Sequence, residues 1–343
     1  MRLRILHITS RADHSGGPRH VYDVVRGMRD AADVFVACPN DRPFRDRYVE
    51  LLGPQRVFTI PHRRFSLSAL MALEGAIYRE RIHIVHSHGR GAGFYSRPLA
   101  RMTGVSCVHT FHYVNTSSKP WTLEEKWLAR YATAVVAVSG TEAECLRRFD
   151  VVPAEKINII TNGVDVPGTV PSADVPVRQV VGIMRLEPEK SPDLFVDICR
   201  LLPAAVECRV LGSGTMMAAL RTSGRAEFPG AVDEPRDYLT PGTIYLATSK
   251  GEGLSLAMLD AMALGVPVVA SAVAGHTDLI RDGENGLLYP WGDAIRAATQ
   301  IVGLLEDTSL RQRLAEAAWR TVTHSYRVER MVDDLMKLYE AKG

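Results

Sequence analysis

An acidic residue stands in a glycine-flanked turn, and a second acid follows eight positions later. Glu252 lies within Lys250-Gly-Glu-Gly-Leu-Ser-Leu256, and Asp260 lies in the apolar helix predicted after this turn. Buried strands are predicted on either side, at 243–248 and 266–271. A strand, a turn and a helix in this order leave unpaired backbone N–H groups at the helix start, which attract phosphate. An acid beside a phosphate is better suited to binding hydroxyls or stabilising positive charge, so the pattern favours a sugar nucleotide as the ligand.

Two cations follow another predicted strand. Arg185 comes directly after the strand at 179–184, and Lys190 lies five residues later, near the next helix start. Two positive charges at this place are able to hold both phosphates of a nucleotide diphosphate and to stabilise a leaving group. An arginine and a lysine this close are more often plain surface charge. The pair alone therefore does not decide between a diphosphate site and a charged surface.

Histidines end two predicted strands of the first half. His86 and His88 close one strand, and His109 and His112 close another. Histidines at positions i and i+2 are able to bind a metal, but no acid or cysteine has a spacing that completes a site. We therefore predict no metal site here, and we expect His86, His88 and His109 to be packed or turn-forming side chains.

The segment around Glu252 resembles the Glu-x7-Glu signature of the retaining family-4 glycosyltransferases, which have the GT-B fold. The resemblance continues through Ala274-Gly-His-Thr-Asp-Leu-Ile280 and Asp282-Gly-Glu-Asn-Gly-Leu-Leu288, in the same order of loop, helix, strand and turn. The sequence departs from the family pattern at four positions. Those residues are Ser255 for Gly, Asp260 for Glu, Ala274 for Gly and Asp278 for Glu.

The resemblance implies a role for each matching residue. Glu252 would contact the donor sugar, His112 would line the sugar site, and Arg185 and Lys190 would hold the diphosphate. Asp260 would bind the ribose, although its side chain is one methylene shorter than that of Glu. The donor-binding residues implied by the resemblance are Gly16, Gly17, Gly212, Gly214, Val232, Gly253, Leu254, Ser255, Leu256 and Asp260.

No metal and no other cofactor is expected on the diphosphate. Enzymes of the other major glycosyltransferase fold hold a divalent metal there with an Asp-x-Asp motif, and this sequence has none after a strand. Arg185, Lys190 and the helix start at Leu254–Leu256 would take the place of the metal.

The 343 residues suit about two domains, with the 46% apolar and 23% charged content of a globular protein. Short β-branched runs alternate with helical patterns, which predicts parallel α/β sheets. Residues 166–176 contain three prolines and a glycine and are predicted to be a linker. The strands are predicted at 3–9, 33–38, 57–61, 82–87, 106–111, 134–139, 157–161, 179–184, 207–212, 227–228, 243–247, 266–271 and 287–289.

We therefore expect an N-terminal domain at 1–165, a C-terminal domain at 177–323 and a last helix at about 324–343. The resemblance implies that this is the α/β GT-B fold, with two Rossmann-like domains facing each other across a cleft. The resemblance implies that the N-terminal domain binds the acceptor and that the last helix packs back on it.

Charge and cysteine content bear on partners and location. Residues 1–165 carry 23 Lys and Arg against 16 Asp and Glu, a charge of +7, and the rest carry 18 against 23, a charge of −5. The basic half fits equally an anionic partner, such as a membrane surface, and a solvated arginine-rich face. The five cysteines are scattered and form no Cys-x-x-Cys pair, and we recognise neither a signal peptide nor a membrane span. These features predict a cytoplasmic protein, with the inner face of the membrane as a place of attachment.

The implied reaction transfers a sugar from a UDP-, GDP- or TDP-sugar to a hydroxyl of a glycan, glycolipid or lipid-linked sugar, with retention of configuration. The loop at 113–127, with Tyr113, Lys119 and Trp121, and the first-half arginines are expected to form the acceptor site. Two alternatives stay open: a sugar-nucleotide epimerase of GT-B fold and a non-catalytic sugar-nucleotide-binding protein. Nucleic acid is not expected as a partner, and the missing Gly-x-Gly-x-x-Gly fingerprint disfavours a nicotinamide enzyme.

Overall fold

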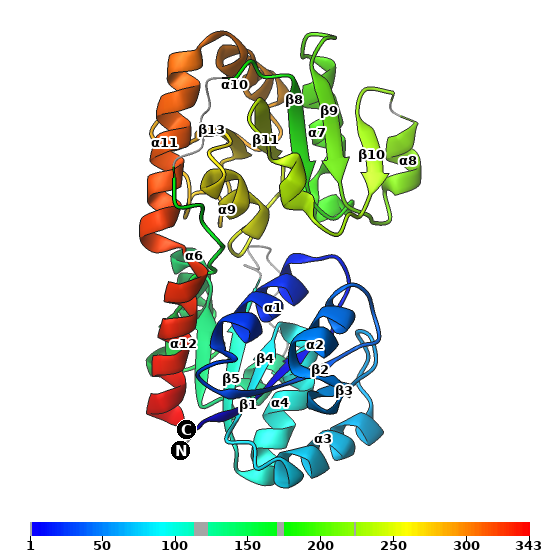
Figure 1. Cartoon of the computed structure of the whole chain (residues 1–343), viewed down its shortest axis with the longest axis vertical. Coiled ribbons are helices and arrows are strands. Elements are labelled where there is room, and N and C mark those ends of the chain that lie inside the picture. The colour runs from blue at the N-terminus through cyan, green and yellow to red at the C-terminus, as the bar shows by residue number, and fades with distance from the viewer. Residues whose placement is uncertain (1, 113–122, 170–174, 223) are drawn as a thin grey trace. The chain divides into compact units, whose positions relative to one another are not determined.

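The computed structural model describes residues 2–112, 123–169, 175–222 and 224–343, which form two compact units (Figure 1). The N-terminal unit consists of Met1–Asn162 and Val328–Gly343, and the C-terminal unit is Gly163–Arg327. The chain therefore passes between the units twice, after Asn162 and after Arg327. Both units are parallel α/β structures, as the alternating strand and helix patterns predict.

The N-terminal unit is built on a seven-stranded parallel sheet in the order β3-β2-β1-β4-β5-β6-β7. Its strands are β1 (Arg4–Thr9), β2 (Asp33–Cys38), β3 (Val57–Thr59), β4 (Ile84–His88), β5 (Ser106–Phe111), β6 (Ala134–Ala137) and β7 (Ile157–Ile159). Its helices are α1 (Gly16–Met28), α2 (Phe44–Leu52), α3 (Leu67–Arg79), α4 (Arg90–Thr103), α5 (Leu123–Ala129), α6 (Gly140–Arg148) and α12 (Val328–Lys342).

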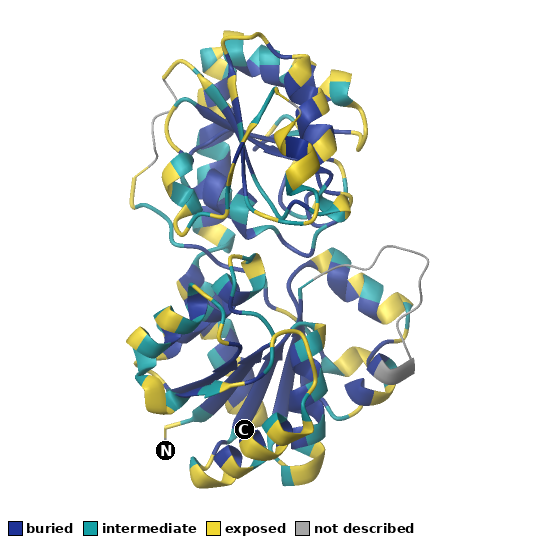
Figure 2. Ribbon diagram, turned by 90° about the vertical axis from the view of Figure 1, so that its right-hand side faces the viewer, coloured by how far each residue is buried: buried dark blue, intermediate teal, exposed yellow. Residues whose placement is uncertain are grey.

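The two faces of this sheet bury separate apolar clusters, because successive residues of a strand point to opposite faces. Ile5 of β1 belongs to the cluster that includes α1 and α12, whereas Leu6 belongs to the cluster that includes α3 and α4. Figure 2 shows the result: the inner strands of the sheet are buried along their length, whereas the helices around it carry both buried and exposed residues.

The C-terminal helix α12 belongs to the N-terminal unit and packs against α1. A methyl group on Gly27 of α1 would lie 2.6 Å from Cγ2 of Val332, so the glycine allows the two helices to approach closely. Tyr339 is fully buried, and its hydroxyl lies 2.5 Å from Nδ1 of His86 in β4. The predicted helix at 324–343 is thus divided, since His324 and Ser325 end the preceding helix, α11, in the other unit.

The C-terminal unit has a six-stranded parallel sheet in the order β10-β9-β8-β11-β12-β13. Its strands are β8 (Gln179–Ile183), β9 (Glu207–Leu211), β10 (Glu227–Gly230), β11 (Thr243–Ala247), β12 (Val268–Ser271) and β13 (Leu287–Tyr289). Its helices are α7 (Pro192–Arg200), α8 (Met217–Arg221), α9 (Leu256–Ala263), α10 (Ala294–Glu306) and α11 (Thr308–Ser325). Helices α7 and α10 cover one apolar face, and α9 packs against α11, β11 and β12.

Candidate active site

The strand order of the C-terminal sheet reverses between β8 and β11. In open parallel sheets the loops after such neighbouring strands diverge and leave room for a ligand at the carboxyl edge. The loop after β8 carries Arg185 and Lys190, and the loop after β11 carries Glu252. Two hydrogen bonds tie these loops together: Thr248 Oγ1 donates to the carbonyl of Lys190, and the Lys250 N–H donates to that of Glu189, each over 2.9 Å.

Lys190 and Glu252 form an ion pair at this reversal. Nζ of Lys190 lies 2.5 Å from Oε1 of Glu252, and the two side chains are only 12% and 18% exposed. The hydroxyl of Ser249 donates to the same oxygen over 2.8 Å. Both hydrogen bonds end on Oε1, and no hydrogen bond to Oε2 is made by the part of the chain that the structure describes. The second oxygen therefore keeps its capacity to accept a ligand hydroxyl.

The charge state of Glu252 depends on Lys190. Burial by itself raises the pKa of the Glu252 carboxyl, but Lys190, His276 and the hydrogen bonds to Oε1 together outweigh burial and lower this pKa below its ordinary value. His276 lies nearby, and burial lowers its own pKa, so its ring is neutral at pH 7. Lys190 is consequently the cation that keeps the buried Glu252 ionised.

Two glycines let the backbone approach this centre. At Gly275 the φ angle is +82°, and an added Cβ would lie 2.5 Å from the carbonyl oxygen of Glu252. At Gly212 the φ angle is +141°, and an added Cβ would lie 1.9 Å from the carbonyl oxygen of Met184. Only glycine meets both conditions, a left-handed φ and no room for a side chain. The loops after β9 and β12 are thereby held against the loops that carry Arg185 and Glu252.

Arg185 and Asp260 each have an ionic partner in the C-terminal unit. Nη2 of Arg185 lies 2.7 Å from Oε1 of Glu189, within the same loop. Asp260 in α9 is 1% exposed, and its Oδ1 lies 3.4 Å from Nη1 of Arg236. Arg236 also donates to the carbonyl of Asp165 over 3.1 Å. The shorter acid at position 260 therefore lies beside a guanidinium, which orients its carboxylate.

The remaining predicted donor residues of this unit lie at strand and helix ends. Ser255 caps α9, because its Oγ accepts a hydrogen bond from the N–H of Met258 over 3.3 Å. A serine at this position therefore satisfies one of the unpaired donors of the helix start. Gly253, Leu254 and Leu256 around it are buried. Gly214 follows β9, and Val232, half-buried, follows β10.

Three predicted site residues belong to the N-terminal unit. Gly16 and Gly17 form the start of α1, and His112 directly follows β5. A side chain added to Gly17 would meet nothing within 4 Å, so the backbone there is open to a ligand. The predicted acceptor residues Tyr113, Lys119 and Trp121 lie outside the described residues.

The prediction that three other histidines are packed side chains is confirmed. His86, His88 and His109 are 0%, 4% and 1% exposed. His86 pairs with Thr110 through its second nitrogen over 2.7 Å, and His109 pairs with Ser87 over 2.8 Å.

Three residues of the site were not predicted from the sequence. Ser249 and His276 contact or face Glu252, and Arg236 pairs with Asp260. His276 stands in the 274–280 segment that carries part of the family resemblance, so its place in the motif was a signal for it. Nothing in the local sequence marks Ser249 or Arg236, because their roles depend on how the loops meet.

Comparison with known families fits this arrangement. Residues 14–166 match the family model described as Glycosyltransferase Family 4, and residues 177–307 match the model described as Glycosyl transferases group 1. The chain therefore belongs to the family-4 glycosyltransferases, and it is a glycosyltransferase of the two-domain GT-B fold.

Individual relatives are named as glycosyltransferases. The chain is 25% identical to the UDP-Gal:alpha-D-GlcNAc-diphosphoundecaprenol alpha-1,3-galactosyltransferase of Escherichia coli, over 90% of this chain and 88% of the relative. It is 28% identical to the lipopolysaccharide core biosynthesis mannosyltransferase LpcC of Rhizobium leguminosarum bv. viciae, over 85% and 87%. It is 25% identical to the sulfoquinovosyl transferase SQD2 of Arabidopsis thaliana, over 92% and 70%.

Solved structures share the fold at lower sequence identity. The HepE protein of Anabaena, crystallised with UDP and glucose, superposes with a TM-score of 0.86 at 17% identity, covering 99% of this chain and 100% of that protein. Sucrose-phosphate synthase of Thermosynechococcus elongatus superposes with a TM-score of 0.83 at 20% identity, covering 99% of each chain.

Because of this ion pair, we expect the loss of stability caused by removing Lys190 to depend on pH. In Lys190→Met the buried Glu252 loses its cation, so at pH 8 the variant should be less stable than the parent by about 2–3 kcal/mol. Without Lys190, burial raises the pKa of Glu252, and the carboxyl takes up a proton as the pH falls toward 5. The deficit should therefore shrink between pH 8 and pH 5, as measured by urea unfolding. In the parent, the pKa of Glu252 lies below its ordinary value of 4.5, so the pair keeps its contribution throughout this range.

Lys250→Met is the matched control for this measurement. Lys250 is exposed in the same loop, over the ring of Trp291, and should give a small deficit that does not change with pH. An equal deficit of Lys190→Met at both pH values would contradict the electrostatic account.

Proposed function

We propose that this chain is a retaining glycosyltransferase that moves a sugar from a UDP-sugar to a hydroxyl of a lipid-linked or glycolipid acceptor. The observation that carries the proposal is the Lys190–Glu252 pair at the reversal between β8 and β11. The choice of UDP is supported by the Escherichia coli relative, whose name specifies UDP-Gal, and by HepE, which binds UDP. Several relatives are named for products with lipid parts, which supports a lipid-linked acceptor.

Lys190 suits the donor diphosphate because an ammonium group has three N–H donors. One of them points to Glu252 Oε1, which leaves two for phosphate oxygens. Arg185 follows β8 on the same loop and would exchange its contact with Glu189 for a phosphate oxygen when the donor binds. The start of α9 adds N–H groups at the same edge of the sheet.

Glu252 would act on the sugar. As the bond between the anomeric carbon and the β-phosphate oxygen breaks, its electron pair goes to the phosphate and the sugar gains positive charge. The ionised carboxylate, through its second oxygen, would bind a sugar hydroxyl and stabilise this charge. His112 would line the sugar site, and Asp260, oriented by Arg236, would bind the ribose.

Bond formation completes the reaction on the same face of the sugar. The acceptor hydroxyl attacks the anomeric carbon from the side on which UDP departs, and the departing phosphate takes the hydroxyl proton. The products are UDP and a glycoside of unchanged anomeric configuration. Because Lys190 and Arg185 balance the phosphate charge, the proposed step needs no divalent metal on the diphosphate.

The alternatives are less well supported. A sugar-nucleotide epimerase or a binding protein would share the donor site, but the relatives compared above are named as transferases. An epimerase would also convert the donor without any acceptor, which the following experiment detects.

Donor turnover tests the proposal directly. Full-length protein is incubated with UDP-, GDP- and TDP-sugars, with and without Mg²⁺, and nucleotide release is measured. We expect slow release from a UDP-sugar at a rate independent of Mg²⁺. Lys190→Ala and Glu252→Ala should each lower this rate by roughly 10²–10³, the usual loss for a group that stabilises transition-state charge.

Lys337→Ala is the control for this series, because Lys337 is 76% exposed on α12 and should leave turnover unchanged. Full turnover by folded Lys190→Ala would refute the proposed role of the pair. Epimerised donor without released nucleotide would favour the epimerase.

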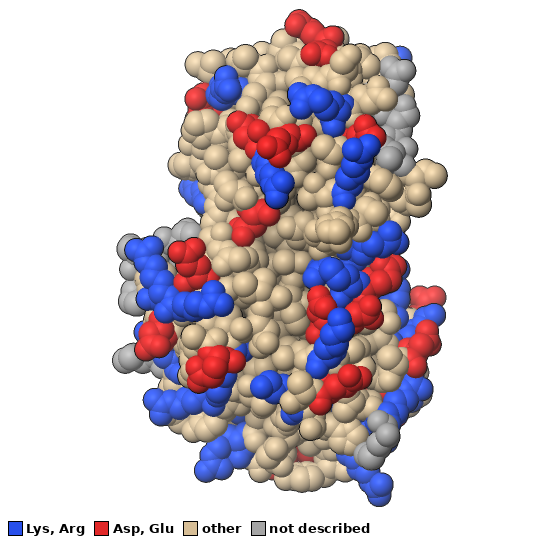
Figure 3. Space-filling view, turned by 90° about the vertical axis from the view of Figure 1, so that its left-hand side faces the viewer, with Lys and Arg blue, Asp and Glu red and all other residues tan. Residues whose placement is uncertain are grey.

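Attachment to an anionic membrane is proposed for the N-terminal unit. No helix of the described residues is both long and apolar enough to cross a bilayer. On the face shown in Figure 3, basic and acidic side chains intermingle, so the basic excess forms no single patch there. Helix α3 offers a better surface: Leu67, Met71 and Tyr78 are 65%, 50% and 61% exposed along one stripe, and Arg63 and Arg64 precede the helix.

Vesicle co-sedimentation tests this attachment. The protein should bind phosphatidylglycerol vesicles at low salt and be released at high salt, because the arginines act through screened charge. Met71→Ser with Tyr78→Ser should lower the bound fraction several-fold. Ile295→Ser, at a residue 72% exposed in the C-terminal unit, should not. No binding at low salt would remove the membrane proposal and leave glycosyl transfer untouched.

A further inference from the structure

The N-terminal sheet also reverses its strand order, between β1 and β4, and histidines gather at this reversal. His20 comes from the first turns of α1, His88 ends β4, and His112 follows β5. One ring nitrogen from each lies within 4.8 Å of the other two. The ring centroids of His20 and His112 are 4.6 Å apart, and that of His88 is 5.3 Å from His20 and 5.7 Å from His112.

These rings carry buried nitrogens without hydrogen-bond partners among the described residues. The atoms are both ring nitrogens of His20, Nδ1 of His88 and Nε2 of His112. His20 and His88 are only 3% and 4% exposed. A buried polar atom without a partner costs free energy, so three such side chains facing one another point to a missing ligand.

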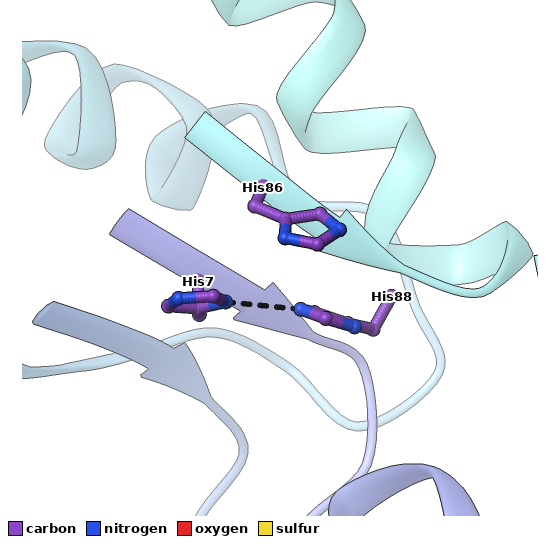
Figure 4. A group of neighbouring side chains, drawn as sticks. All are labelled: His7, His86 and His88. Atoms are coloured by element: carbon purple, nitrogen blue, oxygen red, sulfur yellow. Dashed lines mark hydrogen bonds between the residues drawn. The ribbon is translucent and has the colours of Figure 1, made fainter. Parts of the chain in front are cut away.

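A chain of hydrogen bonds fixes the tautomer of His88. Nε2 of His7 lies 3.3 Å from the sulfur of Met28, and a thioether only accepts, so the proton of His7 is on Nε2. Nδ1 of His7 is then an acceptor, and Nε2–H of His88 donates to it over 3.0 Å, the contact drawn in Figure 4. Nδ1 of His88 is left with a lone pair, which is the form that coordinates a metal.

The side chain of Asn162 lies beside His20 and interacts with its ring. An amide in that place would serve as an outer-shell partner for a metal-bound His20.

We propose that His20, His88 and His112 form a binding site for one divalent transition-metal ion, such as Zn²⁺, at the carboxyl edge of the N-terminal sheet. Three imidazoles with an open fourth position are a known zinc arrangement, and all-nitrogen ligands disfavour Mg²⁺ and Ca²⁺. Zinc–nitrogen bonds of about 2.0–2.1 Å place ligand nitrogens about 3.4 Å apart, so the rings close on the ion by rotation of their side chains. The third ligand, His20, comes from α1 and lies 68 positions before His88, so no local spacing in the sequence reveals it.

The neighbouring trio of His7, His86 and His88 is a poorer candidate. Its nitrogens are also within 4.8 Å, but both ring nitrogens of His86 are engaged, with Tyr339 and Thr110. His7 uses both of its nitrogens as well, with His88 and Met28. These two histidines support His88 and do not bind the ion.

The test measures metal in tag-free, full-length protein without donor or acceptor, so its outcome is independent of the proposed glycosyl transfer. After incubation with Zn²⁺ and dialysis, the parent protein should retain a stoichiometric amount by elemental analysis. The Co²⁺ form should show the visible absorption of a four-coordinate ion. His20→Gln and His88→Gln should each lower the affinity by at least about tenfold.

His109→Gln is the matched control, since His109 is equally buried in β5 but is outside the trio, and it should retain the ion. X-ray absorption of the zinc-loaded parent should report imidazole ligands and needs no variant, so misfolding of His20→Gln would not obscure the result. A parent protein that retains no Zn²⁺, or equal retention by folded His20→Gln and His109→Gln, would overturn the proposal.

Discussion

The ion pair between Lys190 and Glu252 is the constraint on which the C-terminal unit depends. The Glu252 carboxylate is only 18% exposed and is kept ionised by its neighbouring cation, and the loops after β8 and β11 are fastened to each other so that the cation is there. The pair costs desolvation of both groups, and ionisable pairs of this kind cluster at functional sites. Here it provides a negative charge for a sugar and positive N–H donors for phosphate within one small volume.

The parallel topology explains why the functional residues of each unit gather at one edge. Each sheet reverses its strand order once. The loops at the reversal carry Lys190 and Glu252 in the C-terminal unit, and in the N-terminal unit the start of α1 carries His20 and the end of β4 carries His88. Helices supply groups to the same edges, through the Ser255 cap of α9 and the glycine start of α1. In each unit, polar residues thus gather at the carboxyl edge of the parallel sheet, at the point where its strand order reverses.

Much of this fold could be predicted from the sequence, because β-branched runs and amphipathic periods are local properties. The predicted strands at 33–38, 106–111, 243–247 and 287–289 coincide with β2, β5, β11 and β13, and the others differ only at their ends. The order of strands within the sheets could not be predicted, since it depends on long-range packing. For that reason Glu252 and Lys190 were identified separately by their motifs, whereas Ser249, Arg236 and His20 were missed. The split of the last helix between α11 and α12 was missed as well, because no proline or glycine marks the break at 326–327.

The most direct test of the central claim is a double-mutant cycle on donor turnover with Lys190→Ala, Glu252→Gln and the double variant. If the two side chains act as one unit, the double variant should be about as slow as the slower single variant. The interaction energy should then equal the smaller of the two single losses, about 3–4 kcal/mol for rate losses of roughly 10²–10³. If the two losses multiply, with no interaction energy, Lys190 and Glu252 act independently and the ion pair is not the basis of the site.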